Sequence, residues 1–268
     1  MAEYRVTALF YRFTSDTRRD TFVAAAPRSD SLGSFSCTLA DGVLEAIPSV
    51  EFRDRQAARD ALEPHLRDWE ESAYLSDRAH RIQFVYDRST VEEVDPQPGV
   101  ISLFGEAHGF GFAAATLTIA QRDNAEYPPF DAGFRRTELT ERLASRLRSA
   151  RDDREPWPAF AYFVLTSVCV EYGRAPDARV AAARELRVSR QVLRCLGQIS
   201  SKGDRHVGRK AAAREESITV AERAWLEAVA VRLIRRVGEH AAGGPLPQIT
   251  LADFLTSRCG PQTRHRRA

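Results

Sequence analysis

The sequence predicts an α+β protein: an N-terminal, mostly antiparallel β-sheet with a covering helix, followed by a C-terminal all-α helical bundle. Three observations lead to this prediction. Residues 4–120 contain several segments in which apolar and polar residues alternate, the period of a half-buried strand. Residues 137–240 instead repeat their apolar residues every three or four positions, as amphipathic helices do. No regular β-α-β alternation occurs, so a parallel sheet is not expected.

The strands begin near the N-terminus. Residues 4–13 alternate and are rich in β-branched and aromatic side chains, and they predict the first strand. Residues 35–39 and 43–47 predict a hairpin, because Asp41 and Gly42 between them tolerate the positive φ angles of a tight turn. Further strands are expected at residues 21–26, 80–87, 100–104 and 110–120.

One long helix is expected to cover this sheet. Residues 49–74 have helical spacing, and Pro64 within them should kink the helix or divide it in two. Apolar residues lie on one side of the segment: Ala58, Ala61, Leu62, Leu66 and Trp69.

The helical region starts after Pro128 and Pro129. Residues 137–149 predict a helix with one narrow apolar stripe, made of Leu139, Leu143 and Leu147. Such a stripe is either a core contact or a seam for a partner helix. Residues 159–172 are apolar almost all round, which is typical of a helix at the centre of a bundle, and Gly173 should end that helix.

A long helix closes the bundle. Thr219 and Glu222 form the pattern of a capping box, so this helix should run from there to about His240. We expect its arginines to point outward: Arg232, Arg235 and Arg236. Residues 249–255 should dock as one helical turn, and the basic residues 262–268 should be a disordered tail.

Charge supports a division into domains. Residues 1–130 hold 13 Arg against 21 Asp and Glu, whereas the remainder holds 26 Lys and Arg against 16 acids. The expected organisation is an acidic α+β domain at 1–130, a basic helical domain at 131–241, and a linker with the docking turn and tail at 242–268. A split of this size indicates two regions with different partners, or regions that attract each other.

Several classes of protein are not expected. The longest nearly apolar run, residues 160–170, is much shorter than the roughly 20 residues of a membrane span, and the N-terminus does not resemble a secretion signal. The four cysteines are far apart and read as buried thiols rather than as disulfides or metal ligands. We therefore expect a cytoplasmic protein with no cofactor, no metal and no membrane partner.

Catalysis is not indicated. The sequence lacks the common nucleophile, zinc and phosphate-binding motifs, and its six histidines form no cluster with metal-ligand spacing. Glu106 and His108 could form an acid/base pair, but they lie in a glycine-flanked segment that reads more simply as a solvated turn. An active site built from residues dispersed along the sequence stays open.

The most informative stretch is residues 178–199. An Ala-rich helix ends at Leu186, a short turn holds Arg187 and Val188, and Ser189 caps a second helix. This order resembles a generic helix-turn-helix, without pointing to a specific family. It departs from the common pattern at Arg187, because the turn often holds Gly, which adopts a left-handed backbone at lower cost.

The resemblance implies a set of nucleic-acid contacts. With Val192, Leu193 and Leu196 turned inward, the second helix would present Arg190, Gln191 and Arg194 to base edges in a groove. The loop that follows contains the only two lysines of the chain, and its basic residues would contact phosphates: Lys202, Arg205, Arg209 and Lys210.

Two functional hypotheses remain from the sequence. The first is a non-catalytic nucleic-acid-associated protein, regulatory or accessory, that contacts DNA or RNA through its basic helical region. The second is a protein-interaction adaptor, or a subunit of a larger assembly, without any nucleic-acid contact. Its protein partner would bind the acidic N-terminal region or the Leu139/Leu143/Leu147 stripe. An ordinary helical hairpin with solvated arginines accounts equally well for residues 178–199.

Overall fold

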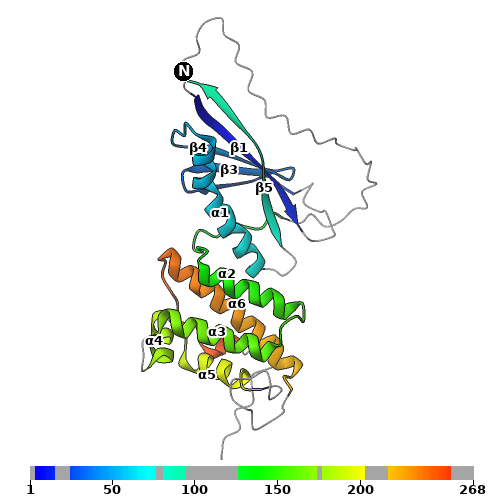
Figure 1. Ribbon diagram of the computed structural model, residues 1–268, viewed down its shortest axis with the longest axis vertical. Helices are drawn as coiled ribbons and strands as arrows, with labels where there is room; N and C mark the ends of the chain where they lie inside the picture. Colours follow the sequence, from blue (N-terminus) through cyan, green and yellow to red (C-terminus); the bar gives the residue numbers. More distant parts are fainter. Residues whose placement is uncertain are drawn as a thin grey trace, which may run out of the picture. The chain divides into compact units, whose positions relative to one another are not determined.

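The structure is a computed structural model of the whole chain. It describes residues 4–15, 25–76, 81–94, 126–173, 177–202 and 217–254. The chain divides into two compact units, Met1–Asp131 and Ala132–Ala268. Among the described residues, the first unit contains strands and one helix, whereas the second is built of helices (Figure 1).

The first unit contains a five-stranded sheet in which every neighbouring pair is antiparallel, in the order β2-β3-β4-β1-β5. The strands are β1 (Tyr4–Ser15), β2 (Arg28–Leu32), β3 (Phe35–Ala40), β4 (Val43–Pro48) and β5 (Ile82–Glu93). With the helical second unit, this sheet confirms the predicted α+β class.

The hairpin between β3 and β4 forms as the sequence predicts. Asp41 and Gly42 both have a left-handed backbone, with φ angles of 49° and 73°, and Ala40 pairs directly with Val43. Gly42 also donates a backbone hydrogen bond to the hydroxyl of Tyr127 (2.9 Å), so the residues that follow the sheet return to its turn. Turn chemistry therefore fixes the register of these strands.

One helix, α1 (Arg55–Ser76), packs on the sheet (Figure 1). It starts later than predicted because the carboxylate of Asp54 accepts hydrogen bonds from Gln56 N and Ala57 N (3.1 Å each) and so caps it. Pro64 does not divide the helix. The apolar side of α1 lies in the core with the sheet, and this burial offsets the one backbone hydrogen bond that a proline removes.

Two differences from the predicted strands stand out. The strand β2 was not predicted, because its sequence Arg-Ser-Asp-Ser-Leu is mostly polar and lies at the edge of the sheet. β5 continues to Glu93, beyond the predicted end at residue 87. The strands predicted at 100–104 and 110–120, and most of that at 21–26, lie outside the described residues.

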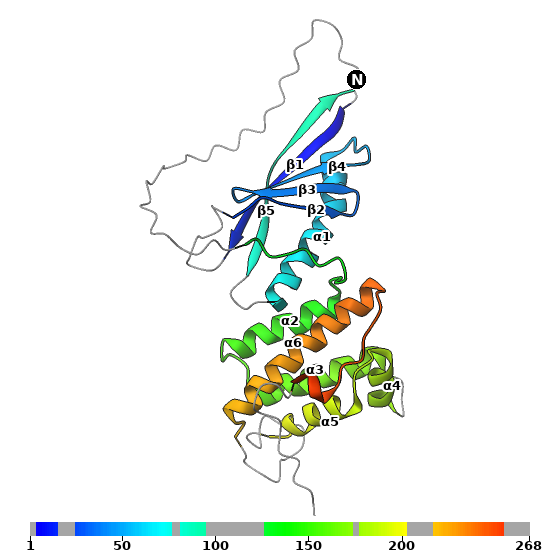
Figure 2. The same cartoon turned by 180° about the vertical axis from the view of Figure 1, so that it is seen from behind.

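The second unit is a bundle of helices, which also confirms the predicted class (Figure 2). The helices are α2 (Glu138–Arg151), α3 (Trp157–Tyr172), α4 (Ala178–Glu185), α5 (Arg190–Ile199) and α6 (Val220–Ala242), followed by the short 3-10 helix η2 (Leu251–Phe254). α3 contacts α2, α4, α5 and α6, and is therefore central to the bundle, as its apolar sequence predicts.

The leucine stripe of α2 belongs to the core of this bundle. Leu139, Leu143 and Leu147 are all buried, and α2 packs against α3 and α6. The alternative interpretation, a seam open to a partner protein, is therefore wrong: the partner helices are supplied by the chain itself.

A close contact also ties α6 to the segment before α2. The ring of Phe134 is buried directly over Gly238, and Arg135 N donates a hydrogen bond to Gly238 O (3.1 Å). A Cβ at Gly238 would lie 2.2 Å from Phe134 Cε2, closer than atoms can approach. Glycine is required here because of this approach, although it weakens the interior of a helix.

We expect Gly238→Ala to lower the free energy of unfolding by about 1–3 kcal/mol, since the overpacking penalty exceeds the gain in helix propensity. Urea unfolding of the full-length protein measures this change. Gly244→Ala is the matched control, because a Cβ at Gly244 would meet nothing within 4 Å. Equal stability of the two variants would contradict the proposed contact.

Candidate nucleic-acid interface

The helices α4 and α5 are joined by a four-residue turn, and hydrogen bonds fix the conformation of its backbone. Arg187 has a left-handed backbone with φ 52°, the conformation for which a helix-turn-helix often uses glycine. Val188 N donates to Ala183 O (2.8 Å), and Arg187 N donates to Arg184 O (3.2 Å). These two bonds form a Schellman motif, which ends α4 and offsets the strain at Arg187.

The start of α5 is equally well defined. The hydroxyl of Ser189 accepts a hydrogen bond from Gln191 N (3.2 Å), as expected of the predicted N-cap. The extended chain around Ile249 pairs with the turn, because Ser189 N donates to Ile249 O and Ile249 N donates to Arg187 O (2.8 Å each). The turn is thereby held from outside as well as by its own caps.

A buried arginine of α6 completes this support. The side chain of Arg236 is 0% exposed, so the prediction that it points outward is wrong. Its Nη1 donates to Leu186 O (2.8 Å) and its Nη2 to Pro247 O (2.7 Å), while Nε donates to Glu239 Oε2 (2.9 Å). Arg236 thus joins α6, the C-terminal end of α4 and the segment that pairs with the turn.

The position of the Arg236 guanidinium at the C-terminal end of α4 explains why its charge can be buried. The last carbonyl groups of a helix have no partner within it and carry partial negative charge, so a cation there is stabilised. Burial lowers the pKa of Arg236, but Glu239 opposes that effect by pairing with the guanidinium. Arg232 Nη1 donates to the other oxygen of the same carboxylate (2.8 Å), and is therefore also engaged.

Helix α5 has one buried and one exposed face. Its buried residues fill the space toward α3, α4 and α6: Val192, Leu193, Cys195, Leu196 and Ile199. Arg190, Gln191 and Arg194 are exposed, as predicted, and helical spacing places them on one side. Arg187, one turn earlier, is also exposed. We call these four residues the α5 face.

The arginines of this segment differ from most others in the described structure. Elsewhere arginines commonly pair with carboxylates, for example Arg59 with Glu63 (2.8 Å) and Arg151 with Glu227 (2.8 Å). Between residues 177 and 202 a set of arginines forms no ion pair with any described carboxylate: Arg179, Arg184, Arg187, Arg190 and Arg194. The segment therefore presents positive charge that the described residues do not neutralise.

Lys202 behaves differently from the α5 face. Its Nζ contacts Glu222 Oε1 at 2.7 Å, and the two side chains are only 24% and 14% exposed. Glu222 also completes the predicted capping box with Thr219. The ammonium group of Lys202 is thus already paired within the fold, and its contact with phosphate stays a prediction. The other predicted contacts of the loop lie outside the described residues: Arg205, Arg209 and Lys210.

Other kinds of site receive no support from the described part of the chain. It contains no group of three or more His, Cys, Asp or Glu arranged to hold a metal ion. Its helices also include none that is long and apolar enough to cross a membrane. Glu106 and His108, the acid/base candidates, fall outside the described residues.

Comparisons with protein-family models, with curated proteins and with solved structures find no match to this chain.

Removing the Arg236 guanidinium should destabilise the protein strongly. We expect Arg236→Met to cost about 3–5 kcal/mol, because Glu239 and the carbonyl groups of Leu186 and Pro247 would lose a buried cationic donor. Urea unfolding measures the loss. Arg184→Met, at an exposed arginine that pairs with none of the described carboxylates, should change stability by about 0.5 kcal/mol or less. A similar small change in both variants would refute the role given to Arg236.

The Lys202–Glu222 pair should make stability depend on pH. Burial raises the pKa of Glu222, but hydrogen bonds from Lys202 and Thr219 outweigh it and hold the pKa below its ordinary value of 4.5. A carboxyl group with a lowered pKa stabilises the fold above its unfolded-state pKa, and the stabilisation disappears as pH falls through the folded-state pKa.

Glu222→Gln should therefore lower the free energy of unfolding at neutral pH, with a deficit that shrinks as pH falls below 4.5. Glutamine keeps one carbonyl oxygen that can accept from Thr219 N, so the capping box is retained while the ion pair with Lys202 is lost. Unfolding of both proteins across this pH range measures the effect. A deficit that stays constant with pH would contradict the assignment.

Proposed function

We propose that this protein is a non-catalytic nucleic-acid-binding protein and that the α5 face contacts the nucleic acid. One observation carries the proposal: exposed arginines that pair with none of the described carboxylates gather on one side of a helix whose preceding turn is held by hydrogen bonds. Phosphate backbones attract such charge, and side chains that are free of internal partners can exchange counterions for phosphates. A solvated surface helix would more commonly mix the two signs of charge.

The side chains of the α5 face are suited to recognising bases as well as to attracting phosphates. Arginine can donate two parallel hydrogen bonds to guanine, and glutamine can bond both edge groups of adenine. Arg190, Gln191 and Arg194 supply these types from one turn of α5. Arg187 precedes the helix, and we propose that it contacts a phosphate. Fixed backbone at the turn lowers the entropy lost when these side chains bind.

Among nucleic acids, duplex DNA fits best. The major groove of B-form DNA admits an α-helix, whereas the deep, narrow major groove of A-form RNA does not. Binding to single strands commonly depends on aromatic side chains that stack on bases. Residues 177–202 contain no Phe, Tyr or Trp.

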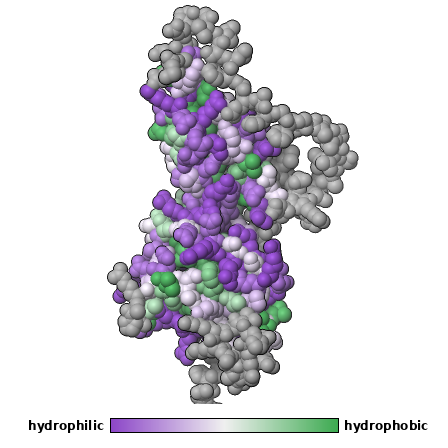
Figure 3. Space-filling view, in the orientation of Figure 1, coloured by the Kyte–Doolittle hydropathy of each residue, from purple (hydrophilic) through white to green (hydrophobic). Residues whose placement is uncertain are grey.

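The adaptor hypothesis loses one of its two supports, because the leucine stripe of α2 is buried in the bundle. On the face drawn in Figure 3, the coloured residues form a mostly hydrophilic surface with small, separate hydrophobic patches. The acidic composition of the first region still permits a protein partner. Capture of proteins by a chain that fails to bind DNA would favour this alternative.

Anisotropy with labelled random duplex DNA, duplex RNA and single-stranded DNA tests the proposal. Full-length protein should prefer duplex DNA, and affinity should fall steeply between roughly 50 and 200 mM salt. The variant Arg187→Ala/Arg190→Ala/Arg194→Ala should lose most of this binding. Each phosphate contact removed should reduce the salt slope by about one.

Three arginines that form ion pairs provide the matched control: Arg53→Ala/Arg142→Ala/Arg154→Ala removes the same charge from other places. The control should bind like the unmodified protein. If both triple variants lost DNA affinity equally, the α5 face would matter only through its share of the net charge, and the proposed interface would be wrong. Absence of salt-sensitive binding by the unmodified protein would overturn the proposed function.

A further inference from the structure

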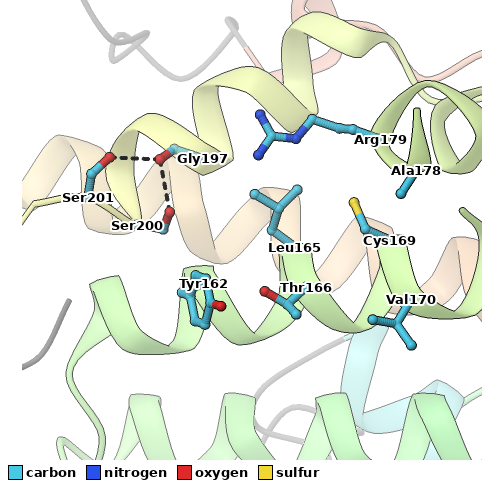
Figure 4. Close-up of a pocket in the computed structure, with 10 residues that line it drawn as sticks. All are labelled: Tyr162, Leu165, Thr166, Cys169, Val170, Ala178, Arg179, Gly197, Ser200 and Ser201. Atoms are coloured by element: carbon cyan, nitrogen blue, oxygen red, sulfur yellow. Dashed lines mark hydrogen bonds between the residues drawn. The ribbon is translucent and has the colours of Figure 1, made fainter. Parts of the chain in front are cut away.

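A groove with a volume of about 460 Å³ lies between α3, α4 and α5 (Figure 4). One side is formed by α3 and the other by the start of α4 and the end of α5. Pockets of roughly 300–1,000 Å³ are typical of small-molecule sites. The α5 face does not line this groove, so the two features use different residues.

The charge of the groove has one sign. Arg179 from α4 extends its guanidinium across the groove toward Gly197, over Leu165 and Cys169 (Figure 4). Arg179 pairs with none of the described carboxylates, and the described residues that line the groove include no Asp or Glu. Its interaction with the Cys169 thiol leaves this charge uncompensated. An anionic group is the partner that such a guanidinium lacks.

Because residue 197 is a glycine, no side chain of α5 occupies the space beside the Arg179 guanidinium. A Cβ at Gly197 would lie 3.3 Å from Leu165 Cδ2 and 3.5 Å from both Nη atoms of Arg179. Any larger side chain would therefore enter the space between Arg179 and α3. The absence of a side chain on α5 keeps the charged end of the groove open.

The α3 side of the groove is largely apolar. Leu165, Cys169 and Val170 line it, with the polar side chain of Thr166 between them and Tyr162 farther along the helix (Figure 4). Val170 is 75% exposed, although most large apolar side chains of the bundle are buried. An apolar group of a ligand would cover this surface and gain from its removal from water.

We propose that the groove binds a small amphipathic anion, with its anionic group on Arg179 and its apolar body along α3. The guanidinium supplies charge-assisted hydrogen bonds, which fix the orientation of the ligand. Leu165 and Val170 contact the apolar body. The ligand would touch α3, α4 and α5 together, and would therefore brace the two helices that flank the turn.

Fluorescence titration of the full-length protein with anilinonaphthalene sulfonate tests this site, because the probe combines a sulfonate with an aromatic body. We expect one probe to bind per chain and octanoate to displace it more effectively than octanol. Arg179→Gln should weaken binding by roughly tenfold or more, the effect of losing a hydrogen bond to a charged group. Val170→Glu should weaken it similarly, by adding a like charge to the exposed α3 side.

Arg184→Gln is the control, because Arg184 is an exposed arginine of α4 that does not line the groove. It should bind the probe like the unmodified protein. Circular dichroism checks that each variant is folded. No binding, or equal binding by all four proteins, would overturn the site. Neither outcome would bear on the α5 face, whose DNA binding is measured separately and without the probe.

Discussion

The helical unit depends on one buried guanidinium. Arg236 lies on α6, yet its three donor nitrogens bond three other places: the end of α4, the chain at Pro247, and Glu239 one turn further along α6. Hydrophobic packing alone holds helices together without specifying where a polar turn must lie. Directional bonds from a group that cannot lose its charge impose that position. The placement of α5 thus follows from an interaction that its own sequence does not contain.

This support explains how the turn tolerates a residue that it would not choose by itself. A left-handed backbone at Arg187 costs a residue with a Cβ on the order of 1 kcal/mol. The Schellman bonds of α4 and the pairing with Ile249 offset the cost. Because position 187 is an arginine and not a glycine, it adds a third positive charge near Arg190 and Arg194. The strained position therefore adds to the exposed cationic surface.

Sequence reasoning captured the features that depend on local chemistry. The hairpin at Asp41 and Gly42, the cap at Ser189 and the apolar spacing of α5 are each set by neighbouring residues, and all were predicted. The features that were missed depend on distant ones. In the sequence, nothing distinguishes Arg236 from an arginine on the exposed side of α6. Its burial becomes evident only when the carbonyl groups of Leu186 and Pro247 are found beside it. Likewise, Lys202 cannot be distinguished from a free lysine until Glu222 is placed beside it. The exposure of Arg190, Gln191 and Arg194 follows from their helical spacing. That the two arginines pair with none of the described carboxylates does not.

Chemical-shift mapping by NMR, with a short DNA duplex added to isotope-labelled full-length protein at low salt, tests the central claim most directly. Arginine side chains have their own Nε–Hε signals, so the exposed and buried guanidinium groups can be followed separately. We expect the largest chemical-shift changes at residues 187–194, whereas the Nε–Hε signal of the buried Arg236 should stay unchanged. Changes confined to the acidic first unit, or spread evenly over paired and unpaired arginines, would contradict this claim.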